Sequence, residues 1–275
     1  MNKMLKRDTL IGEIMPPVWA EFQKVRRSKM SWLTAVAFSV VTLIAGLFMY
    51  ILKDPERARQ LGLVGAKAQV FGGTADWASF INLALIMMAV GGLIIFGLIF
   101  VWIFGREFAD KTVYDMLSLP TSRLTIVVAK IVTATCWSAV FVLLVFVLML
   151  AIGALLGLPG WSATTILNGL RLLLVTGLLI TLTCSFFALV ASVARGYLAA
   201  VGCIFAALVL GQIIAQLGYG EYFPWTVPLL FSGAAEALTG APPTQPGAIS
   251  LLLVALTGSL GWVLLGTWWR NADQS

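Results

Sequence analysis

Residues 77–105 read WASFINLALIMMAVGGLIIFGLIFVWIFG and contain no charged side chain. A helix needs about 20 apolar residues to cross the roughly 30 Å of hydrocarbon in a bilayer. Only helices and closed barrels satisfy their backbone polar groups in lipid. Barrel strands alternate polar and apolar residues, and this run does not. The run therefore predicts a membrane-spanning helix.

Further uncharged runs cover residues 32–52, 131–170, 172–194, 196–220 and 237–269. The run 131–170 is too long for one span, and Leu158-Pro159-Gly160-Trp161 interrupts it with a turn signal and an interfacial aromatic residue. Two helices are expected to meet there. The predicted spans are about 32–52, 79–104, 124–157, 165–193, 196–217 and 248–269.

The composition also requires lipid as the solvent. Hydrophobic residues make up 60% of the 275 residues and charged residues 11%, whereas about a quarter of an average soluble domain is charged. Too few charges remain for a water-facing shell. We predict an all-α integral membrane protein, with an N-terminal segment 1–31 and a single six-helix transmembrane domain 32–275, and not a soluble enzyme.

The distribution of lysine and arginine predicts the orientation, because cytoplasmic loops carry an excess of both. With the N-terminus inside, both termini are cytoplasmic, and no cleavable signal peptide is expected before the first span. The net charge of +6 follows from this bias and predicts no nucleic-acid partner. The outer segments then hold only these of the 18 basic residues: Lys53, Arg57, Arg59, Lys67 and Arg171.

Residues 14–31 have the pattern of a helix that lies in the membrane interface. Pro16 and Pro17 are expected to start it, and a generic basic flank is the alternative interpretation. The basic cluster would bind anionic headgroups. The apolar face holds Val18, Trp19, Phe22 and Val25, the other face holds Glu21, Lys24 and Arg27, and the cluster is Lys24, Arg26, Arg27 and Lys29.

Two outer segments are expected to contain short elements. Asp54-Pro55-Glu56 predicts the start of a helix over 55–70, which Gly72-Gly73 would end. Residues 218–247 are apolar but contain Pro224 and Pro228, which exclude a continuous spanning helix. A re-entrant or interfacial hairpin before the last span fits better.

Several kinds of chemistry are missing. The chain has no histidine, which excludes histidine triads and HExxH zinc sites. It has no GxxxxGK[ST] phosphate loop, and all twelve acidic residues lie outside the predicted spans, which disfavours an ion-coupled carrier. Cys136, Cys184 and Cys203 are interpreted as packing residues. We predict no catalytic site, no metal site and no cofactor bound by this chain.

The connection between the second and third spans, residues 104–130, combines charge with helix signals. Asp110 is expected to cap a short amphipathic helix that Pro120 ends. The charged face would point into the cytoplasm as a docking surface, although a capped connector without a partner remains an alternative. The apolar face would be Val113, Met116 and Leu117, and the charged face Arg106, Glu107, Lys111 and Asp115.

The same segment resembles the coupling segment of ABC type-2 exporter permeases. The residues Phe104-Gly105-Arg106-Glu107-Phe108, Asp110-Lys111-Thr112, Leu117-Ser118-Leu119-Pro120-Thr121-Ser122-Arg123 and Ala129-Lys130 are similar to that family's FGREY, DKT, LLxLPxSR and AK pattern. Weaker similarities are Glu21, Lys24, Arg27-Ser28-Lys29 and Trp32 before the first span, and Phe223-Pro224-Trp225 through Pro228-Leu229 before the last.

The resemblance, which is nearest to the bacitracin-resistance and lantibiotic-immunity branch, implies a bacterial inner-membrane permease. This chain would pair with a second half, the same or a homologous chain, and with two cytoplasmic ATPase subunits that hold ATP and Mg²⁺. It would export peptide antibiotics, drugs or lipid-like compounds, or confer immunity to them, by alternating access. The family places the helix near 107–119 in a groove of the ATPase. The expected coupling residues are Arg106, Glu107, Phe108, Asp110, Lys111, Thr112, Asp115, Leu117, Pro120 and Arg123.

Polar residues within spans tend to face the interior of the bundle. This predicts a substrate path at Asn82, Asn168, Arg171, Gln212 and Gln216. Helix-to-helix hydrogen bonding or snorkelling at span ends is the alternative for each of them, and snorkelling is favoured for Lys130. A stand-alone secondary carrier or channel is the second interpretation of the chain, and a membrane enzyme or scaffold is the third. The long outer segment 53–78 departs from the family pattern.

Overall fold

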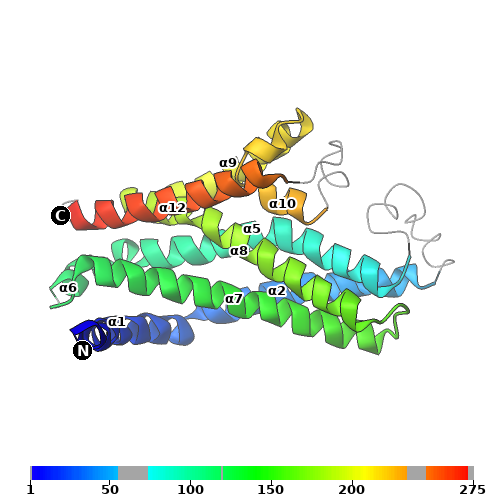
Figure 1. The fold of residues 1–275 in the computed structure, drawn as a ribbon, viewed down its shortest axis with the longest axis horizontal. Coiled ribbons are helices and arrows are strands. Elements are labelled where there is room, and N and C mark those ends of the chain that lie inside the picture. The colour runs from blue at the N-terminus through cyan, green and yellow to red at the C-terminus, as the bar shows by residue number, and fades with distance from the viewer. Residues whose placement is uncertain (1, 55–73, 119, 234–245, 272–275) are drawn as a thin grey trace.

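A computed structural model describes residues 2–54, 74–118, 120–233 and 246–271, with side chains from Ile14 onward except that of Leu117. The described part is mainly helical, and from α2 onward the successive long helices run in alternating directions along one bundle (Figure 1). The elements are α1 (Asn2–Arg27), α2 (Lys29–Leu52), α5 (Trp77–Ala109), α6 (Val113–Leu117), α7 (Arg123–Leu155), α8 (Ala163–Val193), α9 (Leu198–Gln216), η1 (Gly220–Tyr222), α10 (Val227–Phe231) and α12 (Ala248–Asn271).

The six helices α2, α5, α7, α8, α9 and α12 are long and apolar enough to cross a membrane. They correspond one to one to the predicted spans, so the prediction of six helices of this length and composition is confirmed. The largest difference in length is at α5, which continues to Ala109 instead of ending at 104. The additional turn brings Arg106 and Glu107 into the end of a spanning helix.

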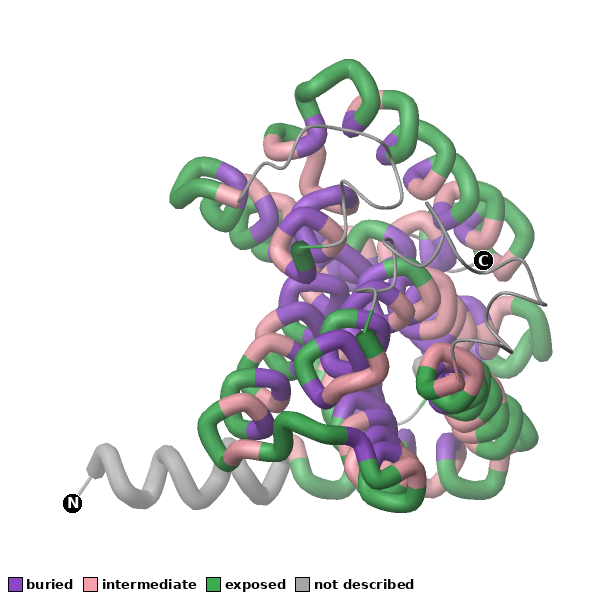
Figure 2. Tube along the Cα trace, turned by 90° about the vertical axis from the view of Figure 1, so that its right-hand side faces the viewer, coloured by how far each residue is buried: buried purple, intermediate pink, exposed green. Residues whose placement is uncertain are grey.

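Helices α5 and α8 form the centre of the bundle. They pack extensively against each other and carry long series of buried residues, whereas α2, α9 and α12 are buried along narrower stripes. Figure 2 shows the buried residues along the interior and the exposed ones on the outward faces of the surrounding helices. Small residues allow close contact, since Gly258 and Gly261 of α12 lie against Leu182 and Ser185 of α8.

Helix α1 differs from its predicted form. It begins at Asn2 and contains Pro16 and Pro17 in its interior, so the expectation that these prolines start the helix was wrong. A proline inside a helix removes one backbone hydrogen bond and crowds the carbonyl four residues earlier, which usually kinks or ends the helix, but α1 continues through this pair. Ser28 separates α1 from α2, and α1 packs against α7.

The described part of the segment before α12 is folded against the bundle. Val227 and Leu230 of α10 are buried, and the Trp225 ring lies 6.1 Å from the Phe187 ring of α8. Residues 234–245 of the predicted hairpin lie outside the described residues, as do residues 55–70 and Gly72-Gly73 of the predicted outer helix.

Candidate functional site at the α6 end

The start of α1, the end of α12 and the short helix α6 all lie at one end of the bundle, called here the α6 end (Figure 1). Helix α5 ends there in a Schellman turn. Thr112 N donates to Glu107 O at 2.9 Å, Lys111 N donates to Phe108 O at 3.3 Å, and Lys111 has a φ of 57°. Asp110 is therefore the C-terminal cap of α5, and Thr112, not Asp110 as predicted, precedes α6. The reason for this difference is that α5 continues one turn further than predicted and takes Asp110 as its own C-terminal cap.

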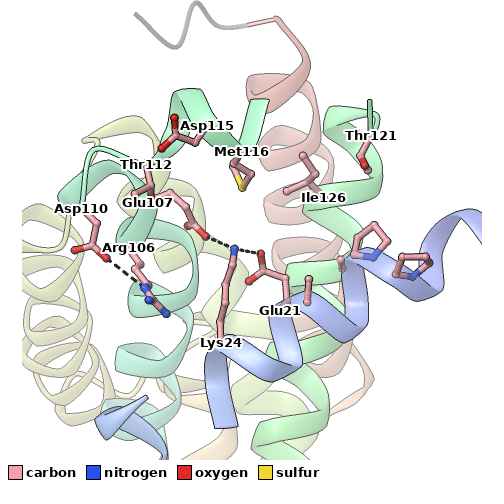
Figure 3. A pocket seen from close by; sticks show the side chains of 14 residues that line it. Glu21, Lys24, Arg106, Glu107, Asp110, Thr112, Asp115, Met116, Thr121 and Ile126 are labelled. Atoms are coloured by element: carbon pink, nitrogen blue, oxygen red, sulfur yellow. Dashed lines mark hydrogen bonds and ion pairs between the residues drawn. The ribbon is translucent and has the colours of Figure 1, made fainter. Parts of the chain in front are cut away.

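A cluster of four charged side chains joins three helices at this end. Lys24 of α1 donates to Glu21 at 2.7 Å and to Glu107 of α5 at 3.0 Å (Figure 3). Lys130 of α7 donates to Glu107 at 2.7 Å and lies 3.5 Å from Glu21. Two acids and two bases alternate around the cluster, so its formal charges cancel.

Three members of the cluster are deeply buried, and Lys24 is half-buried at its edge. Lys130 is 0% exposed, Glu107 4% and Glu21 6%, and Lys130 also donates to Ile103 O at 2.9 Å. Buried charges are tolerated when they are paired and hydrogen-bonded, and removing one partner is costly. Burial disfavours the charged form of Lys24, but attraction to Glu107 and Glu21 outweighs it and raises the pKa of Lys24 above its ordinary value. The ion pairs of the cluster therefore hold α1, α5 and α7 together.

A cavity of about 580 Å³ lies beside the cluster, between α1, α6 and the adjoining ends of α5 and α7. Glu21 and Glu107 on its lining are buried, Lys24 is half-buried, and Asp115 of α6 is exposed. Figure 3 shows α6 over one side of the cavity and α1 across the other. The complete lining is Pro16, Pro17, Ala20, Glu21, Lys24, Arg106, Glu107, Asp110, Thr112, Asp115, Met116, Thr121, Ile126 and Ala129.

Arg106 makes a second ion pair at the edge of this cavity. Its Nε donates to Asp110 Oδ2 at 3.2 Å, and its guanidinium lies 5.1 Å from the centre of the Trp102 ring. Both contacts lie within the last turns of α5. They hold the Arg106 side chain along the helix and balance the charge of Asp110.

The expected coupling residues therefore divide into exposed and structural ones. Lys111, Thr112, Asp115 and Pro120 are exposed around α6, and the side chain of Leu117 lies outside the described part. Glu107 was expected on the exposed charged face, and that was wrong, because its position in the last turn of α5 directs it to Lys130 and Lys24.

Phe108 and Arg123 connect the site to the last span. The Phe108 ring lies 5.6 Å from the Trp269 ring, and Arg123 Nη1 donates to Trp269 O at 3.4 Å. A cation at the C-terminal carbonyls of a helix is also favoured by the helix dipole. These two contacts give Phe108 and Arg123 roles in fixing α12 to α5 and α7.

The expected substrate-path residues lie in different places. Asn82 of α5 and Asn168 of α8 meet at a second cavity of about 460 Å³, together with Thr164 and Thr165. This cavity lies at the first turns of α5 and α8, away from the α6 end. Arg171 is exposed on α8 and is not part of the lining, and Gln212 and Gln216 are exposed on α9. The structure brings together Asn82 and Asn168, but not all five residues.

The sequence interpretation missed the partnership of Lys24, Lys130 and Glu21. Lys24 was assigned to lipid headgroups and Lys130 to snorkelling, and neither was expected in a buried cluster. One signal was available: Lys130 lies two helical turns inside a predicted span, and charges at such positions usually pair within the protein. The cavity had no sequence signal, because helix packing creates it.

Comparison with known proteins adds independent information. Residues 17–211 match the family described as ABC-2 family transporter protein. The chain is also similar to the bacitracin transport permease protein BCRB of Bacillus licheniformis, with 24% identity over 194 residues that cover 70% of this chain and 89% of that protein. The family match includes the charged cluster, α6, the second cavity and all of the first cavity's lining except Pro16.

Proposed function

We propose, from the premise that this chain belongs to the ABC-2 family of transporter proteins, that it is the permease subunit of an ATP-driven exporter. The family match and the six apolar helices make it a multi-pass membrane protein. Its sequence contains no phosphate-binding loop. ATP and Mg²⁺ would therefore be bound by separate ATPase subunits, two in each complex.

The observation that carries this proposal is the attachment of α6 to the spans. Helix α6 follows α5 through the Schellman turn, α7 begins six residues after it, and the ion pair between Glu107 and Lys130 joins α5 to α7 beside it. Tyr114 is 60% exposed on α6 and is available to a partner. A displacement of α6 by closing ATPase subunits would move α5 and α7 together, which is the coupling that alternating access requires.

A second permease half, the same or a homologous chain, would complete the pathway. Exposed apolar residues such as Leu43 on α2, Phe205 on α9 and Leu256 on α12 give these helices surfaces suited to lipid or to a second half. In this arrangement both termini and α6 lie in the cytoplasm, α1 lies in the membrane interface, and the complex resides in the inner membrane of a bacterium.

We further propose an amphipathic cargo. The similar protein from Bacillus licheniformis is a bacitracin transport permease by name, which favours a peptide antibiotic, a drug or a lipid-like compound, either exported or resisted. The cavity bordered by Asn82 and Asn168 would form the polar part of the path. Arg171, Gln212 and Gln216 would contribute elsewhere along it.

Coexpression of the chain with the ABC ATPase encoded by the neighbouring reading frame tests the proposal. We expect the ATPase to copurify, its activity to rise in the presence of the chain, and transport in inverted vesicles to stop when ATP is depleted. Tyr114→Ala should weaken copurification without unfolding the permease. Transport that continues in ATP-depleted vesicles under an ion gradient would overturn the proposal in favour of a stand-alone carrier or channel.

A further inference from the structure

Helix α8 carries an arginine that has no partner within the described part of the chain. Arg171 is exposed, and it makes no hydrogen bond or ion pair with another described residue. It is the only charged residue of α8. A charge in a spanning helix pairs with an opposite charge or reaches the headgroup layer, because hydrocarbon does not solvate it. The partner of Arg171 is therefore to be sought in its surroundings.

Arg171 lies next to the cavity that Asn82 and Asn168 border. Asn168 is three residues earlier, on the same side of α8, and Leu172, the residue after Arg171, lines the cavity itself. The Cα–Cβ bonds of a helix tilt toward its N-terminus, which directs the start of the Arg171 side chain toward the turn of Asn168. A long side chain at this position reaches the rim of the cavity.

The groups around this cavity favour an anion. None of the described residues that line it is acidic. Asp76, the acid nearest to Asn82 in the sequence, is occupied as the cap of α5. Helices α5 and α8 both begin at this end, where their dipoles add positive potential. Amide and hydroxyl groups of the lining can donate hydrogen bonds, and the residues that carry them are Asn82, Thr164, Thr165 and Asn168.

The two asparagines are carried by closely packed helices. A Cβ atom at Gly169 of α8 would lie 3.0 Å from a methyl group of Ile81 of α5, so the two helices touch at this point. Ile81 precedes Asn82 and Gly169 follows Asn168. The contact therefore fixes the backbones of the two asparagines relative to each other, and a preformed pair of donors loses little conformational freedom on binding.

The depth of Arg171 favours a lipid over an ion from the water. Helix α8 has 31 residues, about 46 Å in length, and Arg171 lies about 12 Å from its start at Ala163. In a bilayer with about 30 Å of hydrocarbon centred on α8, Arg171 would lie just beneath the headgroup layer. Further along the same side of α8, Leu174 is 41% and Leu178 55% exposed, and both can contact acyl chains.

We propose that Arg171 and Asn168 of α8, together with Asn82 of α5, bind the phosphate group of a lipid in the leaflet opposite α6. The guanidinium supplies planar, paired donors that match a phosphate, and the asparagine amides donate from the cavity. The acyl chains lie along Leu174 and Leu178. This inference rests on the proposed function, because it takes the cavity as part of the transport path, and it adds the chemistry of the group bound there.

Lipid binding to the purified chain in detergent tests the site without the ATPase. Native mass spectrometry measures the binding of dioleoyl phosphatidic acid, with dioleoylglycerol as the matched lipid that lacks the phosphate. The wild type should bind phosphatidic acid about tenfold or more tightly than dioleoylglycerol, and Arg171→Gln should remove most of this preference because charge-assisted hydrogen bonds are lost. Arg270→Gln, which removes the same charge at an exposed position of α12, should leave the preference unchanged.

Two further variants separate a built site from a cation that only reaches the headgroup layer. Arg171→Lys keeps the charge but loses the planar, paired donors, and it should weaken phosphatidic acid binding severalfold. The double variant Asn82→Leu, Asn168→Leu should weaken it as well, while dioleoylglycerol binding stays the same. Wild-type affinity in both variants would mean that Arg171 only snorkels and would overturn the proposal. Melting temperatures in detergent confirm that each variant is folded.

Competition distinguishes a lipid from a free anion. Inorganic phosphate in large molar excess should not displace phosphatidic acid, since it lacks the acyl chains that contact α8. Displacement would assign the cavity to a water-soluble anion. Oxidation of Asn168→Cys should produce no more linked dimer than the unmodified chain, which has cysteines of its own. Efficient dimer formation that excludes the lipid would assign this side of α8 to the second permease half and would overturn the lipid site.

The site and the proposed function fail in different ways. If the wild-type chain shows no preference for phosphatidic acid, but the coexpressed ATPase copurifies and is stimulated, the lipid site is wrong and the proposed function stands. If phosphatidic acid binds as expected, but no ATPase copurifies and transport continues without ATP, the phosphate site stands and the exporter is overturned.

Discussion

The ammonium group of Lys130 on α7 lies 2.7 Å from Oε1 of Glu107 on α5. This pair is buried in the end of the bundle that also carries α6, and Lys24 of α1 reaches the same carboxylate oxygen. Two spans and the N-terminal helix therefore meet at a single charged group. In an exporter, such a junction would make the three helices respond together to a partner at α6.

Removing one member of the central pair should destabilise the protein strongly. Lys130→Met leaves the buried Glu107 carboxylate with Lys24 but without Lys130. Loss of one partner of a buried ion pair lowers the free energy of unfolding by about 3–5 kcal/mol. The double variant Lys130→Met, Glu107→Leu should recover much of this, because Glu21 and Lys24 remain paired with each other at 2.7 Å. Thermal unfolding in detergent of both single variants and the double variant measures the coupling. Additive losses would contradict a direct interaction.

From about pH 6 upward, the contribution of Lys24 should change only under alkaline conditions. Its pKa is raised in the folded protein, so its stabilising effect is complete below the unfolded pKa and is lost as the pH rises through the folded value. The difference in melting temperature between the wild type and Lys24→Gln should therefore stay constant from about pH 6 to 9 and decrease above about pH 10. A difference that disappears below pH 8 would assign the effect to another group.

Lys111 should be replaceable by glycine without loss of stability. Its φ of 57° is in the left-handed region, where a residue with a Cβ atom pays about 1–2 kcal/mol. Lys111→Gly should therefore stabilise the fold by up to about 1 kcal/mol, whereas Lys111→Val should destabilise it because a branched side chain fits this region poorly. Chemical unfolding compares them, and equal stability of the two variants would show that the turn relaxes.

The sequence predicted the spans well because each follows from local composition, as the uncharged run 77–105 illustrates. It predicted a short helix near Val113–Leu117 from apolar spacing. It assigned Asp110 to the wrong helix, because α5 ends in a left-handed turn at Lys111. Such a turn is usually marked by a glycine in the sequence, and here it is not. The burial of Glu107 could not be predicted, since it depends on Lys130 and Lys24 arriving from other parts of the chain.

Asn82 and Asn168 should act together on substrate if their cavity is part of the transport path. Asn82→Leu and Asn168→Leu should each raise the substrate concentration needed for half-maximal transport, and their combination should do so less than multiplicatively because both line the same cavity. ATPase binding should not change, since α6 lies at the other end of the bundle. Transport by reconstituted complexes provides the measurement, with Ser259→Leu at an exposed position of α12 as the comparison variant.

The close contact of α12 with α8 should tolerate no added methyl group at Gly261. A Cβ atom there would lie 2.8 Å from the Ser185 Cβ atom, whereas at Gly266 on the same helix the nearest atom is a Leu124 methyl at 3.6 Å. Gly261→Ala should therefore cost about 1–3 kcal/mol through overpacking, while Gly266→Ala should stabilise by about 0.5–1 kcal/mol by removing a glycine from a helix interior. Both variants gain the same helix propensity, so their difference in melting temperature isolates the contact.

The same contact should affect the α6 end. The Trp269 carbonyl at the end of α12 accepts a hydrogen bond from Arg123 of α7, so a displaced α12 should also weaken the α6 end. Gly261→Ala should therefore lower ATPase stimulation, while Gly266→Ala leaves it intact. Equal behaviour of the two variants would mean that α8 and α12 separate readily and that α12 is not held as closely as described.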